Sequence, residues 1–257
     1  MSMSQRFVQI VLLLVVMGAL FGCAGLIPIE MQYRVDLEPI LPEGRGEYSV
    51  DPDDSSAVFS VEGALIKVKH LPDQILNEKF PPLWDGKHIN PYASGEKDPE
   101  KGYIPPIFTV FEVAVINKTY AKIEFDPGHM TMITDEGKEF TFYDAERESA
   151  SPNNFRKYYK VELGISGNEK QLALERMGLV YKTAYHRERP VFRGVEHTGF
   201  VAYDPLPECA KEITLRVEDF VLSFDASGNP ERTTDCEFRF KVNQGTFEIV
   251  APQEGSQ

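Results

Sequence analysis

The sequence predicts a mainly β protein, an antiparallel β-sandwich with a small helical insertion. Short runs of β-branched and apolar residues recur between clusters of glycine, proline, asparagine and aspartate, which is the pattern of strands and turns. Two segments interrupt it, a proline-rich connection over residues 71–106 and a block with helical spacing over residues 145–189. Hydrophobic residues make up 42% of the 257 residues, enough for a core.

The first strand signals lie before residue 120. A strand is expected over residues 31–37, and residues 57–71 form either a hairpin or a bulged strand, because Glu62-Gly63 lies in their middle. Residues 107–119 carry apolar side chains at both odd and even positions. A strand that is apolar on both faces is usually central in its sheet.

Later segments supply the remaining strands. Asp135-Glu136-Gly137-Lys138 predicts a tight turn, with glycine where a positive φ is easiest. Strands are expected before and after this turn and in three later runs, "TGFVAYDP", "EITLRVEDFVLSF" and "CEFRFKV", with "DASGNPERTT" joining the last two.

The interrupting block over residues 145–189 predicts one or two helices. Ser151-Pro152 has the pattern of an N-cap followed by proline at the first helical position. Ser166 and Glu169 fit a capping box. A stripe at helical spacing follows, which indicates core packing more often than a site: Ala173, Met177, Val180, Tyr181 and Ala184.

Charge is distributed unevenly along the chain. The formal net charge is −13, which argues against nucleic-acid binding, because such proteins use basic patches to neutralise phosphates. Residues 145–193 nevertheless carry ten Lys and Arg against six Glu, a net of +4. This basic block either faces anionic lipid or cell-wall polymer, or packs against the protein's own acidic surface.

The N-terminus has the pattern of an export signal. Arg6 is the only charge in residues 1–22, and residues 7–21 form an apolar run that is shorter than the ~20 residues of a membrane span. The run ends in Leu20-Phe21-Gly22-Cys23, which resembles the lipobox of bacterial lipoproteins. The alternative is a plain secretory signal followed by a chance cysteine.

The resemblance to lipoproteins implies a domain plan and a location. Residues 1–22 are then a signal peptide, Cys23 is the acylated first residue, residues 23–50 are a lipidated N-terminus and tether, and residues 251–257 are a tail. More than one acyl chain gives stable membrane attachment. No aspartate follows Cys23, and in such lipoproteins this absence goes with transfer to the outer membrane.

The strand pattern has a second resemblance. "FTVFEVAVINKTYAKIEFDPGHMTMITDEGKEFTF" and the later "GVEHTGFVAYDP" are similar to telokin-like and other immunoglobulin-like sandwich modules of exported bacterial lipoproteins. This resemblance implies an immunoglobulin-like sandwich over residues 51–250, interrupted by the two insertions. Such a fold implies binding or assembly more often than catalysis, although a fold by itself does not give a function.

Aromatic residues in the proline-rich connection are candidate partner contacts. Long loops are often functional, and this one contains Trp84, Tyr92 and Tyr103. The alternative is that these side chains pin the loop to its own sandwich.

Other site chemistry has weak support in the sequence. The five histidines show no zinc spacing, and no cofactor fingerprint is present, so no cofactor, metal ligand or catalytic residue is assigned. The leading hypothesis is a non-catalytic, membrane-anchored envelope lipoprotein with an envelope protein as partner. The alternatives are an envelope hydrolase that uses carboxylates and a carrier of a metal or small ligand.

The two remaining cysteines, Cys209 and Cys236, invite a disulfide in an exported protein. A hairpin of the last two strands places Cys236 opposite Leu222 or Ser223, more than ten residues from Cys209 along the partner strand. At ~3.3 Å per residue, that separation exceeds the ~7 Å limit between bridged Cα atoms. The sequence therefore predicts that the two cysteines are not bonded to each other.

Overall fold

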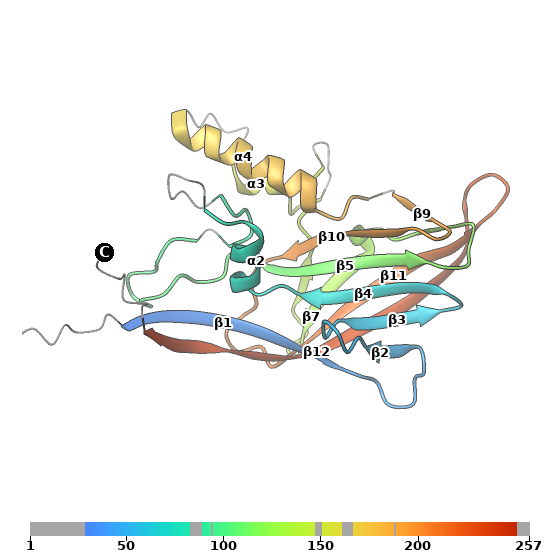
Figure 1. Ribbon diagram of the computed structural model, residues 1–257, viewed down its shortest axis with the longest axis horizontal. Helices are drawn as coiled ribbons and strands as arrows, with labels where there is room; N and C mark the ends of the chain where they lie inside the picture. The colour runs from blue at the N-terminus through green and yellow to red at the C-terminus, as the bar shows by residue number, and fades with distance from the viewer. Residues whose placement is uncertain are drawn as a thin grey trace, which may run out of the picture. The chain divides into compact units, whose positions relative to one another are not determined.

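The computed structural model describes residues 29–82, 89–93, 95–146, 151–160, 167–187 and 189–250. Two antiparallel sheets pack together as a β-sandwich, and helices α2, α3 and α4 lie outside them (Figure 1). The mainly β class and the helical insertion that the sequence predicts are therefore confirmed.

The chain divides into two units, residues 33–246 and residues 1–32 with 247–257. The first unit contains the sandwich and the insertion. In the second, the described residues are the ends of two strands, and the predicted signal peptide, Cys23 and the tail at 251–257 lie outside the described residues.

The larger sheet is built around the two longest strands. β7 pairs with β11 and carries β8 at its other side, and the remaining strands follow the order β1-β12-β11-β6-β9. The bounds are β1 Ile29–Ile40, β6 Lys122–Glu124, β7 Met130–Thr134, β8 Glu139–Thr141, β9 Pro190–Phe192, β11 Glu212–Phe224 and β12 Pro230–Val250.

The smaller sheet has the order β10-β5-β4-β3-β2. Its bounds are β2 Tyr48–Val50, β3 Ala57–Val61, β4 Ala64–His70, β5 Thr109–Asn117 and β10 Glu196–Tyr203. Of the two readings of residues 57–71, the hairpin is correct. Glu62 and Gly63 have φ of 48° and 89°, and two residues with positive φ form the tight turn whose twist matches a hairpin.

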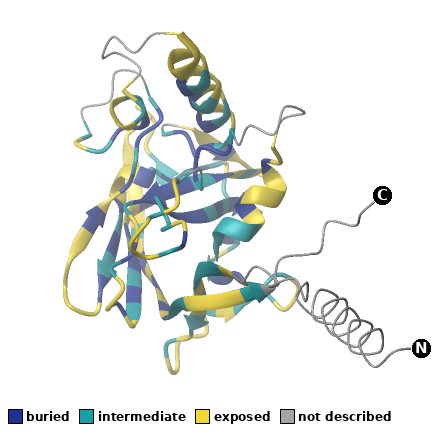
Figure 2. Ribbon diagram, turned by 90° about the vertical axis from the view of Figure 1, so that its left-hand side faces the viewer, coloured by how far each residue is buried: buried dark blue, intermediate teal, exposed yellow. Residues whose placement is uncertain are grey.

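The core has two parts that share the smaller sheet. Between the sheets, β5 contributes Phe111, Val113 and Val115, while Val110 points to a second cluster beneath the helices. Figure 2 shows buried positions on both the strands and the inner side of the insertion. The central position predicted for residues 107–119 is confirmed, because β5 lies between β4 and β10.

The sandwich begins earlier than the sequence predicts. The segment at residues 23–50 is expected to be a tether, but β1 and β2 lie within it and pair with sheet strands. The expected strand at 31–37 is part of β1, whose alternating apolar residues fit one face of a sheet. The boundary at residue 51 is therefore wrong.

Helix boundaries differ from the expectation in two places. α2 (Asp73–Lys79) lies inside the proline-rich connection, where no helix is expected. α3 (Phe155–Tyr158) is capped by Asn154, which accepts the backbone N–H of Arg156, so Ser151 is not its N-cap. α4 (Gly167–Thr183) carries the predicted apolar stripe, of which Tyr181 alone is exposed.

The last hairpin forms with a different register. Cys236 pairs with Val217 rather than with a residue near Ser223, because only residues 225–229 form the turn and β12 already starts at Pro230. Asp225 stabilises this tight turn by accepting the backbone N–H groups of Ser227 and Asn229. Both cysteines are free, as predicted.

Candidate functional site

The helical insertion is fixed on the outer face of the smaller sheet by a cluster of buried side chains. Phe155 of α3 is 1% exposed, and Met177 and Val180 of α4 are also buried. Phe155 contacts Phe108 at a ring distance of 5.3 Å and Tyr92 at 5.8 Å. The insertion therefore has a packed inner side and presents its other side to solvent (Figure 2).

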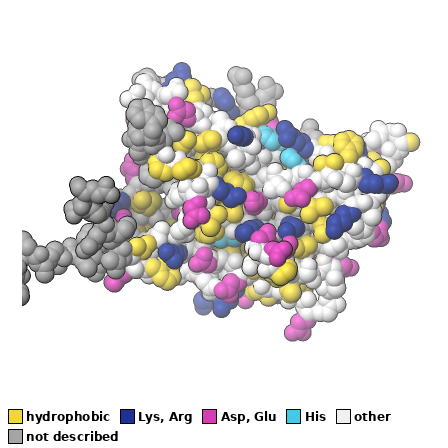
Figure 3. All heavy atoms as spheres, viewed as in Figure 1, with side chains coloured by type: hydrophobic (Ala, Val, Ile, Leu, Met, Phe, Trp, Pro, Cys, Tyr) yellow, Lys and Arg dark blue, Asp and Glu magenta, His cyan; other side chains and the backbone are white. Residues whose placement is uncertain are grey.

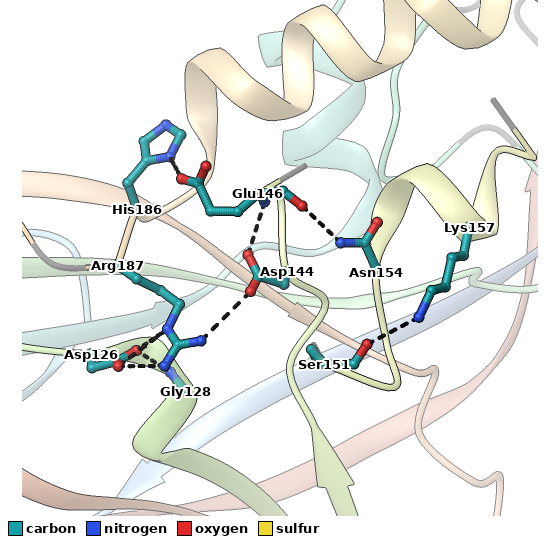
Figure 4. Close-up of polar contacts among 9 residues, drawn as sticks. All are labelled: Asp126, Gly128, Asp144, Glu146, Ser151, Asn154, Lys157, His186 and Arg187. Carbon is teal, nitrogen blue, oxygen red and sulfur yellow. Dashed lines mark hydrogen bonds and ion pairs between the residues drawn. The ribbon is translucent and has the colours of Figure 1, made fainter. Parts of the chain in front are cut away.

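An ion-pair network holds the base of the insertion to the sandwich (Figure 4). Arg187, which follows α4, donates from Nε and Nη2 to both carboxylate oxygens of Asp126, at 2.8 Å for the shortest contact from each nitrogen. Its Nη1 lies 3.9 Å from Asp144, which is almost fully buried. Such two-pronged Arg–carboxylate contacts fix geometry as well as charge.

A histidine fastens the end of α4 to the same network. His186 is 7% exposed, with Nδ1 2.8 Å from a carboxylate oxygen of Glu146 and Nε2 2.7 Å from the carbonyl oxygen of Tyr181. Asn154 donates to the backbone carbonyl of Glu146 at 2.9 Å (Figure 4). Sequence reasoning missed this network, because its members lie up to 61 residues apart and share no local pattern.

The outer side of the insertion exposes apolar and basic side chains together. Leu174 and Tyr181 of α4 are 45% and 55% exposed, and Tyr158 of α3 is 39% exposed. Lys160 and Lys170 are exposed, and no carboxylate among the described residues pairs with either. In the upper part of Figure 3, hydrophobic and basic side chains lie next to each other.

The basic residues of this block thus fall into two groups, one paired within the protein and one exposed to solvent. Arg187 pairs with the protein's own Asp126, as the second interpretation of the block requires. Lys160, Lys170 and Lys182 point to solvent instead. This outer side is the best candidate for a contact surface.

The aromatic residues of the proline-rich connection have mainly structural positions. Tyr92 is fully buried, and its hydroxyl lies 2.9 Å from that of Thr183. Tyr103 is 7% exposed and stacks on Tyr33 at 5.1 Å. Burial of both rings corrects the expectation that they contact a partner, since they pin the loop to its own sandwich. Trp84 lies outside the described residues.

A narrow cleft between β1 and α2 contains perturbed titratable groups. Burial lowers the pKa of His70 to about 3 and raises the pKa of Asp73 to about 6. Arg34 and Gln74 also line the cleft. The enclosed space is about 10 Å³, which holds one water molecule and excludes an organic ligand.

A wider hollow lies on the outer face of the larger sheet. It measures about 300 Å³ and is lined by Glu124, Asp126, His129 and Asp219, among others. Asp126 is already bound to Arg187, and Asp219 is 65% exposed. The hollow therefore offers no buried, unpaired Asp that would serve as a general acid.

Within the described part of the chain, no His, Cys, Asp or Glu side chains form a group that would hold a metal ion. No helix among the described residues is long and apolar enough to cross a membrane. Comparison with known proteins gives no match: no family model, curated protein or solved structure is sufficiently similar to the chain.

Proposed function

We propose that this chain is a non-catalytic lipoprotein of the bacterial cell envelope, acylated at Cys23, that takes part in binding or assembly of an envelope complex. The observation that carries the proposal is Leu20-Phe21-Gly22-Cys23 at the end of a short apolar run with a single preceding charge. The similarity to telokin-like, immunoglobulin-like modules of exported lipoproteins belongs to the same proposal.

The binding role is supported by the outer side of the insertion. Exposed tyrosine side chains on a rigid element are typical of contact surfaces. Here Tyr158, Leu174 and Tyr181 are held in place by the packed cluster and ion pairs beneath them. An envelope protein is the proposed partner of the chain, and no residue of this surface is assigned to it.

Processing at Cys23 tests the anchor. Mass spectrometry of the mature N-terminus is expected to find a diacyl or triacyl cysteine at residue 23. Cys23→Ser is expected to block acylation and processing and to change how the protein is released from membranes during detergent-free fractionation. An unmodified N-terminus at any other residue would refute the proposal.

Outer-membrane delivery has its own matched test. Ala24→Asp places an aspartate directly after the acylated cysteine, and Ala24→Ser changes the same position without a charge. After separation of the membranes on a density gradient, the wild type and Ala24→Ser are expected in the outer membrane and Ala24→Asp in the inner membrane. Identical distributions of all three would contradict this location.

A further inference from the structure

We propose that the outer side of the helical insertion contacts the anionic phospholipid surface of the membrane that carries the chain. This inference rests on the lipid anchor proposed above. It assigns a ligand class to the candidate contact surface.

The first argument is the separation of charge. The chain as a whole is formally −13, but residues 145–193 have a net charge of +4. Within this block Lys160, Lys170 and Lys182 are exposed, and a tethered protein turns such exposed basic residues toward an anionic surface. The charge thus favours one orientation of the molecule.

The second argument is the arrangement of side chains on α4. Lys170, Leu174 and Tyr181 are spaced by four and seven residues, so they share one face of the helix. Both hydrophobic residues on this face are about half exposed. A lysine stem lies along apolar surface while its ammonium remains among polar headgroups, so this face suits the boundary between headgroups and acyl chains.

The third argument is the length of the tether. Ten residues separate Cys23 from Tyr33, where the sandwich unit begins. A fully extended chain of ten residues spans at most ~35 Å. An anchor at Cys23 therefore keeps Tyr33, where the sandwich unit begins, within ~35 Å of the bilayer surface.

The fourth argument is rigidity. The contacts of Arg187 with Asp126 and of His186 with Glu146 fix the end of α4, and the buried cluster fixes its inner side (Figure 4). The outer side thus already has its final conformation before it meets lipid, and contact with lipid requires no refolding of the insertion.

The experiment places a fluorescent label on the insertion of the acylated, full-length mature chain. Leu174→Cys is labelled in a Cys209→Ser background, since Cys236 is buried and unreactive. The protein is reconstituted in vesicles of phosphatidylcholine with 30% phosphatidylglycerol, or of phosphatidylcholine alone, with brominated lipid as quencher. A label at Ser227, in the β11–β12 turn at the other end of the sandwich in Figure 1, is the comparison site.

Quenching is expected at residue 174 in the anionic vesicles and not at residue 227. Lys160→Glu with Lys170→Glu is expected to lower the ratio of lipid-contacting to solvent-exposed label by more than about 25-fold, since each lost lysine contributes about fivefold and each new carboxylate is repelled in addition. The matched control is Lys118→Glu with Lys211→Glu, which changes net charge equally at exposed positions off the insertion. This control is expected to reduce the ratio far less.

Three results would overturn the inference. If the acylated protein remains on the vesicles but the label at residue 174 stays unquenched, the contact is wrong while the anchor stands. If quenching is the same in both vesicle types and insensitive to charge reversal, the anionic surface is not the ligand. If purified cell-wall polymer shields residue 174 and anionic vesicles do not, the ligand is the polymer.

Discussion

His70 and Asp73 lie three residues apart at the junction of β4 and α2, and burial changes their pKa values in opposite directions. Burial lowers the pKa of His70 to about 3. As the pH falls, the unfolded state therefore binds a proton at this histidine before the folded state does. Burial raises the pKa of Asp73 to about 6, so the folded state favours its protonated form. Removal of both groups from water in this cleft thus disfavours the charged form of each.

These shifts predict opposite effects on stability. The Asp73 penalty develops as the pH rises from 3.8 to 6 and is complete above pH 6, so Asp73→Asn is expected to stabilise the protein by about 1–3 kcal/mol at pH 7.5. His70 lowers the free energy of unfolding as the pH falls from 6.5 to 3, because the unfolded state binds the proton more readily. The free energy of unfolding of His70→Gln is therefore expected to fall less between pH 7.5 and pH 4 than that of the wild type.

Urea unfolding at pH 7.5 and pH 4 measures both effects. Asp53→Asn, at an exposed turn position, serves as the control and is expected to change the unfolding free energy by less than about 0.5 kcal/mol. A loss of stability in Asp73→Asn at pH 7.5 would contradict the free-energy penalty assigned to ionised Asp73.

Elements were predictable from the sequence where a local pattern decides them. β5 follows from an apolar run on both strand faces, and the turn after β7 follows from glycine at a position with positive φ. For residues 57–71 the sequence left a hairpin and a bulged strand open, and the positive φ of Glu62 and Gly63 decides for the hairpin. The start of α3 was not predictable, because Ser151-Pro152 and Asn154 both satisfy capping rules and only tertiary contacts select Asn154. The register of β11 with β12 depends on how short a turn the Asp225 side chain supports.

The junction of α4 with β10 depends on one close approach. A Cβ at Gly199 would lie 2.5 Å from the Cα and 2.6 Å from the backbone nitrogen of Tyr185, and backbone atoms there have no freedom to move aside. Gly199→Ala is therefore expected to destabilise the protein by about 2–4 kcal/mol, as overpacking separates α4 from the sheet.

Gly178 provides the matched control for this prediction. It lies on the exposed side of α4 with no atom within 4 Å of an added Cβ. Gly178→Ala is expected to stabilise the helix by about 0.5–1 kcal/mol, since alanine has a higher helix propensity than glycine. Thermal unfolding of both variants measures the difference, and equal melting temperatures would contradict the close approach.

At the scale of the whole molecule, the candidate site was less predictable than the fold. The basic and apolar composition of residues 145–189 is visible in the sequence, but the contacts that fix this insertion are not. Asp126, Glu146 and Arg187 come together only because the sandwich places η1 (Pro127–His129), the end of β8 and the end of α4 side by side. Long-range contacts of this kind leave no periodic signal.

The two hydrophobic clusters lie on opposite faces of the smaller sheet, which predicts that they open separately. Loss of the cluster under the insertion exposes the outer face of β5 and β10 but leaves the contacts between the two sheets intact. Cys236 is 2% exposed between the sheets, and burial raises the pKa of its thiol, so it reacts only when the sandwich opens.

Thiol labelling in native buffer measures this difference. Cys209 is exposed and is expected to react at once, and the two cysteines are expected to yield two free thiols without reductant. Phe238→Ala removes a buried ring from the core between the sheets, and Phe155→Ala removes one from the cluster under the insertion. Each is expected to cost about 3–5 kcal/mol of local packing.

The labelling rate of Cys236 then separates the two variants. Phe238→Ala is expected to accelerate it at least about 100-fold, since a loss of 3 kcal/mol in opening free energy corresponds to more than two powers of ten. Phe155→Ala is expected to increase the labelling rate of Cys236 by a factor at least ten times smaller, because the insertion opens while the sheets stay packed. Equal acceleration by both variants would show that the insertion and the sandwich unfold as one cooperative unit, and the insertion would then be an integral part of the core.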